Sequence, residues 1–108
     1  MNTKILKTLS SVFLFIFLSN ELLADQGISS DQILIGMHTD ISGPASMIGK
    51  QSVDGANMRF SEFNENGGAY GRKVKFIVED HQYTVPRAVQ AANKLLRKDK
   101  IAFMMGSL

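Results

Sequence analysis

The stretch QILIGMHTDISGP, residues 32–44, decides the fold of this 108-residue chain. Its first part, residues 32–37, is an Ile-rich apolar run without polar alternation, which is typical of a strand covered on both faces. The run passes into His-Thr-Asp and then into a segment with Ser, Gly and Pro, which predicts a loop. We therefore expect a buried strand that ends in a polar loop.

The apolar spacing changes from strand-like to helical after this loop. Between residues 46 and 63, apolar side chains recur three and four positions apart and share one face of a predicted helix. Gly49 lies on the same side and is small enough for close approach to a sheet. The segment 64–71 ends the helix, because Gly67 or Gly68 adopts the left-handed conformation at little cost. The stripe consists of Val53, Ala56, Phe60 and Phe63.

Three further elements continue the alternation. Residues 72–79 alternate apolar and charged side chains, which predicts a strand at a sheet edge. Residues 85–98 show helical spacing, and Pro86 fits the first turn, where its missing N–H costs nothing. Residues 101–105, IAFMM, predict another buried strand. The stripe of the second helix consists of Val85, Ala88, Ala92, Leu95 and Leu96.

The order strand, helix, strand, helix, strand predicts an α/β fold with a parallel sheet. The first strand is expected in the middle of this βαβαβ unit and the strand 72–79 at its edge. A parallel sheet buried on both faces needs a helix after its last strand, and none follows here, so we expect an incomplete fold. Residues 25–31 are polar and predict a disordered lead-in.

Residues 1–24 have the pattern of a secretory signal peptide. Lys4 and Lys7 form a basic start, residues 9–18 are an uncharged and mostly apolar run, and Ala24 is small enough to precede a cleavage site. Ten helical residues span about 15 Å, half the roughly 30 Å core of a bilayer, so a membrane anchor is disfavoured. The pattern predicts export to the periplasm.

Composition and charge exclude several classes of function. With 12 basic and 10 acidic side chains, the net charge of +2 favours neither nucleic acid nor an anionic membrane surface as a partner. The chain has no cysteine, which rules out a disulfide framework, a thiolate metal site and a lipid-anchored start.

Two glycine-containing segments look like nucleotide motifs but do not fit them. Residues 43–51 place five residues between Gly and Gly-Lys where a P-loop has four, and Gln51 replaces its Ser or Thr. Gly67, Gly68 and Gly71 precede a strand, whereas a dinucleotide fingerprint follows one. No cofactor is therefore expected. Since no catalytic constellation can be argued either, we predict that the protein is not an enzyme.

Polar side chains follow the first two predicted strands. His38 and Asp40 come after the first strand, and Asp80 and His81 after the second, so all four are expected at the edge where open α/β sheets bind ligands. Metal binding, solute contact and loop hydrogen bonding are all open to these groups, but no ligand set is fixed, so no metal site is predicted. The turn 42–44 leads into a helix whose N–H groups either bind a carboxylate or are capped locally.

Taken together, these motifs resemble the opening of the branched-chain amino-acid (leucine-binding-like) substrate-binding proteins of ABC transporters. The resemblance implies a type I periplasmic-binding fold, in which two α/β lobes close around a solute that a membrane permease then receives. Residues 25–108 would form the first half of the N-terminal lobe. The resemblance rests on ILIG at 33–36, DISGP at 40–44, Gly49, NENGG at 64–68, GRKV at 71–74, VED at 78–80, PRAV at 86–89 and KLL at 94–96.

The resemblance also implies which residues hold the solute, a branched-chain amino acid or a related small carboxylate. In the family, contacts come from the first loop, from the turn after the third strand and from the other lobe. The first loop offers Asp40, Ser42 and Ile48, and the turn begins at Ser107 and Leu108. A ligand-sensing domain of a receptor or regulator with the same lobe is the alternative function.

Export can be tested directly. Mass spectrometry of a periplasmic fraction is expected to find a mature N-terminus near Asp25, because Ala24 is the small residue before the predicted cleavage site. Intact Met1 found in the cytoplasm would contradict the signal-peptide assignment.

Overall fold

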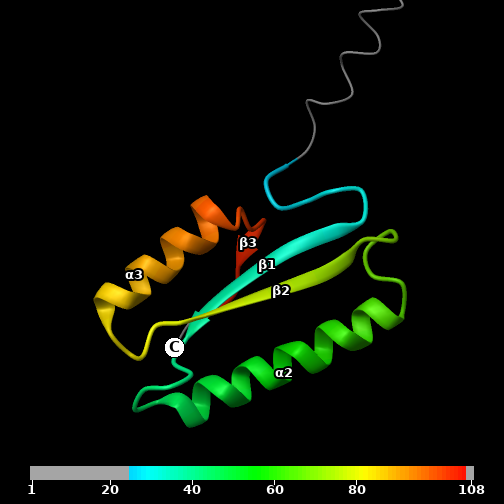
Figure 1. Ribbon diagram of the computed structural model, residues 1–108. Helices are drawn as coiled ribbons and strands as arrows, with labels where there is room; N and C mark the ends of the chain where they lie inside the picture. The colour runs from blue at the N-terminus through cyan, green and yellow to red at the C-terminus, as the bar shows by residue number, and fades with distance from the viewer. Residues whose placement is uncertain (1–24, 107–108) are drawn as a thin grey trace, which may run out of the picture.

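The computed structural model describes residues 25–106 and confirms the predicted α/β order. The strands pair in parallel in the order β2-β1-β3, so the first strand is central and the charged strand lies at an edge, as predicted (Figure 1). None of the helices in this range is long and apolar enough to cross a bilayer. The elements are β1 (Gln32–Thr39), α2 (Ser46–Glu65), β2 (Lys73–Asp80), α3 (Val85–Asn93), its π-helical continuation η2 (Lys94–Lys98) and β3 (Phe103–Met104).

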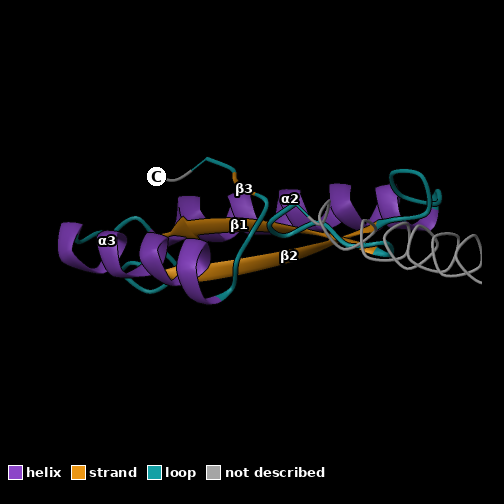
Figure 2. Cartoon of the chain, turned by 90° about the horizontal axis from the view of Figure 1, so that it is seen from above, coloured by secondary structure: helices purple, strands orange, loops and turns teal. Residues whose placement is uncertain are grey.

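The sheet separates α2 from α3, and Figure 2 shows the same arrangement from above. Alternate side chains of β1 point to opposite faces. Gly36 faces the α3 layer, where a Cβ at position 36 would lie 2.5 Å from Ile101 Cδ1 and 3.2 Å from Leu95 Cδ2. Thr39 faces α2. The buried apolar side chains of this two-sided core are Ile35, Met37, Ala91, Leu95 and Ile101.

Helix α2 reaches the sheet through Gly49, which confirms the predicted close approach. A Cβ at position 49 would lie 1.7 Å from the carbonyl oxygen of Asp40 and 3.1 Å from Thr39 Oγ1, so no larger residue fits without a shift. Further along, the apolar stripe of α2 packs against β2, where the ring centroids of Phe60 and Phe76 are 5.1 Å apart.

The end of α2 is tied to the start of β2. Gly67 and Gly68 have φ angles of 98° and 66°, as the predicted helix stop requires. The N–H of Gly68 donates to the carbonyl of Phe63 at 2.9 Å. The side-chain amide of Asn64 donates to the Val74 carbonyl at 2.9 Å and accepts the Val74 N–H at 2.7 Å. The connection therefore fixes where β2 begins relative to the helix.

The predicted apolar stripe of the second helix is partly wrong. Val85 and Leu96 are exposed, whereas Ala91, which the prediction left out, is buried. Val85 is the first residue of α3, at its loop end. Beyond α3, the π-helical turn Lys94–Lys98 has more residues per turn than an α-helix. In this turn Leu95 is fully buried and Leu96 is not.

The predicted strand over residues 101–105 is shorter in the structure, where β3 has only two residues. Lys100 adopts a left-handed φ of 53°, which turns the chain sharply before the strand. Ile101 is buried as predicted, but Phe103 is exposed over half its surface, which contradicts the expectation of a wholly buried strand. Phe103 pairs with Ile35 in the parallel register.

The predicted disorder of residues 25–31 is wrong. The carbonyl of Gly27 accepts the N–H of Leu34 at 2.7 Å, and the side-chain amide of Gln26 donates to the Ile101 carbonyl at 3.1 Å. Gly27 has a φ of 76°, a conformation that glycine adopts easily. The polar composition of the segment conceals these backbone contacts, because main-chain groups make most of them.

Replacing Gly49 by Ala is expected to lower the free energy of unfolding by about 3 kcal/mol, because the added methyl group overpacks the contact with Asp40. Gly55→Ala is the matched control on the same helix, since nothing lies within 4 Å of a Cβ there. That change should raise stability by about 1 kcal/mol through helix propensity. Urea titrations followed by circular dichroism measure both, and equal effects would contradict the packing argument.

Candidate functional site

Two loops lie side by side at the carboxyl ends of β1 and β2 (Figure 1). The two strands run in register, so that Thr39 is opposite Asp80 where both strands end. The first loop, residues 40–45, leads into α2, and the second, residues 81–84, leads into α3. In open parallel sheets, ligands bind at this edge, and His38, Asp40, Asp80 and His81 all lie there as expected from the sequence.

Asp40 organises the first loop from the inside. It is fully buried, and its carboxylate accepts the N–H groups of Gly43 at 2.5 Å and Ala45 at 2.7 Å. The carboxylate of Asp40 thus accepts hydrogen bonds from N–H groups just before α2 that could otherwise bind an external anion. These two N–H groups precede α2, and the helix itself has no side-chain cap at Ala45, so the choice between local capping and a bound carboxylate stays a prediction.

Asp80 joins the two loops. Its carboxylate accepts the Ser42 hydroxyl at 2.6 Å and the N–H groups of Ile41 and Gln82 at 3.0 Å each. The Ser42 oxygen in turn accepts the Gln82 side-chain amide at 3.0 Å. These hydrogen bonds, that of the Ser42 hydroxyl first, lower the pKa of Asp80 to about 2, although partial burial opposes the shift.

The two histidines form an edge-to-face pair, with ring centroids 5.4 Å apart. His81 is buried, and its Nδ1 accepts the N–H of Tyr83 at 3.0 Å, so it helps to order its own loop. His38 Nδ1 is buried without a hydrogen-bond partner. Burial, and then the charge of His81, lower the pKa of His38. Among residues 25–106, no group of three or more His, Asp or Glu side chains is arranged to hold a metal ion.

The second loop contains a feature that sequence reasoning missed. Gln82 and Tyr83 are consecutive non-glycine residues with left-handed φ angles of 51° and 57°. Neither is a residue type that signals this conformation, so only the structure reveals it. The Tyr83 side chain is 59% exposed. It lines a hollow of about 300 Å³ together with His81, Thr84, Val85 and Ala88.

The other predicted contact residues divide into two groups. Ser42 is exposed on the first loop, and Ile48, in the first turn of α2, is 54% exposed. Both side chains are therefore accessible to a solute, unlike the carboxylate of Asp40. Ser107 and Leu108 lie outside the described residues.

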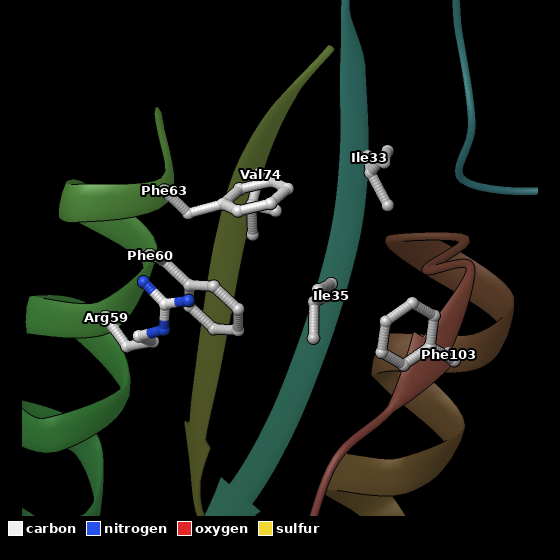
Figure 3. Close-up of a pocket in the computed structure, with 7 residues that line it drawn as sticks. All are labelled: Ile33, Ile35, Arg59, Phe60, Phe63, Val74 and Phe103. Carbon is white, nitrogen blue, oxygen red and sulfur yellow. The ribbon is translucent and has the colours of Figure 1, made fainter. Parts of the chain in front are cut away.

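A second hollow of about 270 Å³ lies on the α2 face of the sheet, away from the two loops. In Figure 3, aromatic rings from α2 stand on one side of β1 and the ring of Phe103 on the other. The lining is apolar apart from Arg59, whose guanidinium pairs with Glu62 at 2.8 Å. This hollow is part of the core-facing surface of the sheet. Its lining residues are Ile33, Ile35, Arg59, Phe60, Phe63, Val74 and Phe103.

The bridge between the loops predicts a specific pH dependence. Because the folded pKa of Asp80 is about 2, below the ordinary value of 3.8, its ionised form stabilises the fold above about pH 4. That contribution is lost as the pH falls toward 2. Unfolding titrations should therefore show a steeper loss of stability over this range for the unmodified chain than for Asp80→Asn.

The control for this titration is Asp54→Asn, at an exposed position on α2. It should keep the steep acid limb of the unmodified chain. Identical acid limbs for the unmodified chain and Asp80→Asn would show that the bridge contributes nothing to stability.

Comparisons with known proteins agree on one family. A family model described as periplasmic binding protein matches residues 32–108. The Leu/Ile/Val-binding protein BraC3 of Rhizobium johnstonii is 35% identical over 74 residues, which cover 68% of this chain and 20% of that protein. The Leu/Ile/Val-binding protein of Escherichia coli K12 is 30% identical over 79 residues, which cover 73% and 21%. The chain spans about a fifth of the length of these relatives.

Solved structures show the same fold. A fatty acid ABC transporter substrate-binding protein from Thermomonospora curvata superimposes with a TM-score of 0.64 at 30% identity, over 65% of this chain and 18% of that one. The branched-chain amino acid transporter substrate-binding protein LivJ of Streptococcus pneumoniae, in complex with isoleucine, gives 0.68 at 24% identity, over 70% and 22%. With its parallel βαβαβ order and a family match from β1 onward, the chain belongs to the periplasmic binding protein family, in the leucine-binding-like, type I branch.

Proposed function

We propose that this chain forms part of the periplasmic solute-binding component of an ABC importer, and that the solute is a branched-chain amino acid or a related small carboxylate. The observation that carries the proposal is the pair of bridged loops at the carboxyl edge of β1 and β2, in a member of this family. Relatives are named for leucine, isoleucine and valine or for fatty acids. All of these solutes combine a carboxylate with an apolar group.

The first loop suits the role of one wall of a solute site. Asp40 fixes the backbone from below, which leaves the Ser42 hydroxyl and the Ile48 side chain at the surface. Because the Ser42 hydroxyl donates to Asp80 and accepts from Gln82, it can accept one further hydrogen bond, from a donor group of the solute. Ile48 can contact an apolar group. Ser107 and Leu108 are proposed as further contacts. A loop that is ordered before binding loses less entropy when the solute arrives.

A single wall does not enclose a small molecule, and small-molecule sites bury most of the ligand surface. We assign the opposite wall to a second lobe, as the resemblance implies, and the full length of the relatives supports this arrangement. In this role the protein passes an unchanged solute to a membrane permease and performs no chemical step. Residues 1–24 are assigned as the signal peptide that directs residues 25–108 to the periplasm.

A fusion tests the proposal. The full chain is joined at Leu108 to the part of the Escherichia coli Leu/Ile/Val-binding protein that follows the matched region. Calorimetry with leucine, isoleucine and valine should give a dissociation constant of about 1 μM or tighter, about −8 kcal/mol. The 108-residue chain alone should give no measurable binding. A folded fusion that binds none of the three solutes would overturn the proposal.

Within the fusion, Ile48→Asp is expected to weaken binding at least about tenfold, because it places an uncompensated charge beside an apolar solute group. Met58→Asp is the matched control. Met58 is an exposed apolar residue on the same helix, almost three turns beyond Ile48. Equal affinities of the two variants would remove Ile48 from the site.

A further inference from the structure

We infer that Tyr83 is a solute-contacting residue, and that its ring forms the part of the site wall that receives the apolar group of the solute. The inference rests on the proposed function and adds a residue from the second loop, which neither the sequence motifs nor the first-loop contacts include. It is based on three observations: the backbone conformation of the loop, the hydrogen bonds that maintain it and the hollow beside the ring.

The conformation of the loop is costly. Gln82 and Tyr83 both have left-handed φ angles, and the left-handed region costs an L-residue roughly 1–2 kcal/mol. Glycine would meet the same demand without strain. Since strained residues cluster at ligand sites, two of them in succession at the ligand-binding edge of a parallel sheet point to a role for their side chains.

Local hydrogen bonds stabilise the left-handed conformation of Gln82 and Tyr83. The N–H of Gln82 donates to Asp80 Oδ1, and the N–H of Tyr83 donates to His81 Nδ1, each at 3.0 Å. Thr84 closes the turn, because its N–H and its hydroxyl both donate to the carbonyl of His81, at 3.0 and 3.2 Å. The ring of Tyr83 is therefore presented from a fixed backbone although most of its surface is exposed.

The hollow beside Tyr83 defines the chemistry of the contact. Val85 and Ala88 supply methyl groups, and His81 and Thr84 supply the polar part of the rim. A tyrosine ring offers a large apolar surface with few rotatable bonds, which favours contact with an aliphatic group. Among the Phe and Tyr residues within 25–106, only Tyr83 lies in one of the two loops at this edge of the sheet.

The second loop is also coupled to the first. Ser42 accepts the Gln82 side-chain amide at 3.0 Å and donates to Asp80 at 2.6 Å. Tyr83 follows Gln82 in the chain. A solute that contacts Ser42 therefore meets the loop that carries Tyr83. The site wall accordingly consists of Ser42 from the first loop, Ile48 from the first turn of α2 and Tyr83 from the second loop.

The chain contains a matched control for this inference. Tyr70 is the other tyrosine, it also has a left-handed φ of 52°, and it is 99% exposed in the turn before β2, at the opposite end of that strand. Replacing either tyrosine by Gly relieves the same backbone strain and removes the same ring. Only the change at Tyr83 should affect solute binding.

The test uses the fusion described above, with leucine, isoleucine and valine as the probes. Tyr83→Gly is expected to weaken binding about tenfold, while Tyr70→Gly leaves the affinity unchanged and Tyr83→Phe keeps most of it. Both glycine variants should keep or raise the thermal midpoint, because glycine accommodates positive φ. A purely structural role of Tyr83 would lower the midpoint of Tyr83→Gly and leave the affinity unchanged.

The outcomes separate this inference from the proposed function. If the fusion binds but Tyr83→Gly behaves like Tyr70→Gly, Tyr83 is not a contact residue and the proposed function stands. If a folded fusion binds no probe, both fail. Should the fusion not fold, residues 80–86 are transplanted into the intact Escherichia coli protein. There the same Tyr83→Gly change must weaken binding relative to the transplanted loop, and an unchanged affinity overturns the inference.

Discussion

The buried carboxylate of Asp40 is the constraint on which the first half of the structure depends. A charge removed from water is stable in a protein only when hydrogen bonds replace its hydration. The loop must therefore bring the N–H groups of Gly43 and Ala45 to within 2.5 and 2.7 Å of that carboxylate. A Cβ at position 43 would lie 2.7 Å from Asp40 Oδ1. The position of the Asp40 carboxylate therefore requires glycine at position 43.

The same residue determines how α2 packs. Gly49 lies against the carbonyl oxygen of Asp40, at a separation that leaves no room for a Cβ. The carboxylate thus fixes the loop, and the carbonyl fixes the first turns of the helix. The pattern of Asp, then Gly three residues later, then Gly six residues after that, is a single packing unit. Its result is a rigid first loop with its polar and apolar side chains facing outward.

Asp80 extends this rigidity to the second loop. It accepts hydrogen bonds from both loops, and the low pKa of its carboxyl group reflects how many donors surround the charge. The two loops then form one surface, although Ser42 and Gln82 are 40 positions apart in the chain. A solute site built on such a surface needs little rearrangement when it is occupied.

Much of this fold could be predicted from the sequence, because it depends on periodicity and on glycine. The strand order, the close approach at Gly49 and the helix stop at Gly67 and Gly68 all follow from local patterns. The turn η2, the ordered residues 25–31 and the short β3 do not, since tertiary contacts determine them.

The candidate site, like the fold, could be predicted only in part. Its location followed from the rule for the carboxyl ends of parallel strands, and Asp40, Ser42 and Ile48 were found on the expected loop and helix start. Loop hydrogen bonding was one of the roles left open for Asp80, but its partners in the two loops could not be predicted, because they depend on the local backbone of both loops. No sequence signal marks Gln82 and Tyr83 as left-handed. Ser107 and Leu108 stay predictions.

Positive φ angles occur just before and just after β2, but different residue types adopt them at the two ends. Before the strand, Gly67, Gly68 and Gly71 supply most of the positive φ angles, with φ between 66° and 98°. After the strand, Gln82 and Tyr83 supply them, although glycine would cost less. What glycine lacks is a side chain, and here the Gln82 amide binds Ser42 while the Tyr83 ring lines a hollow. Tyr70 and Lys100 are single left-handed non-glycine residues elsewhere, whereas Gln82 and Tyr83 are two in succession, at the edge of the sheet where their side chains are available for contact.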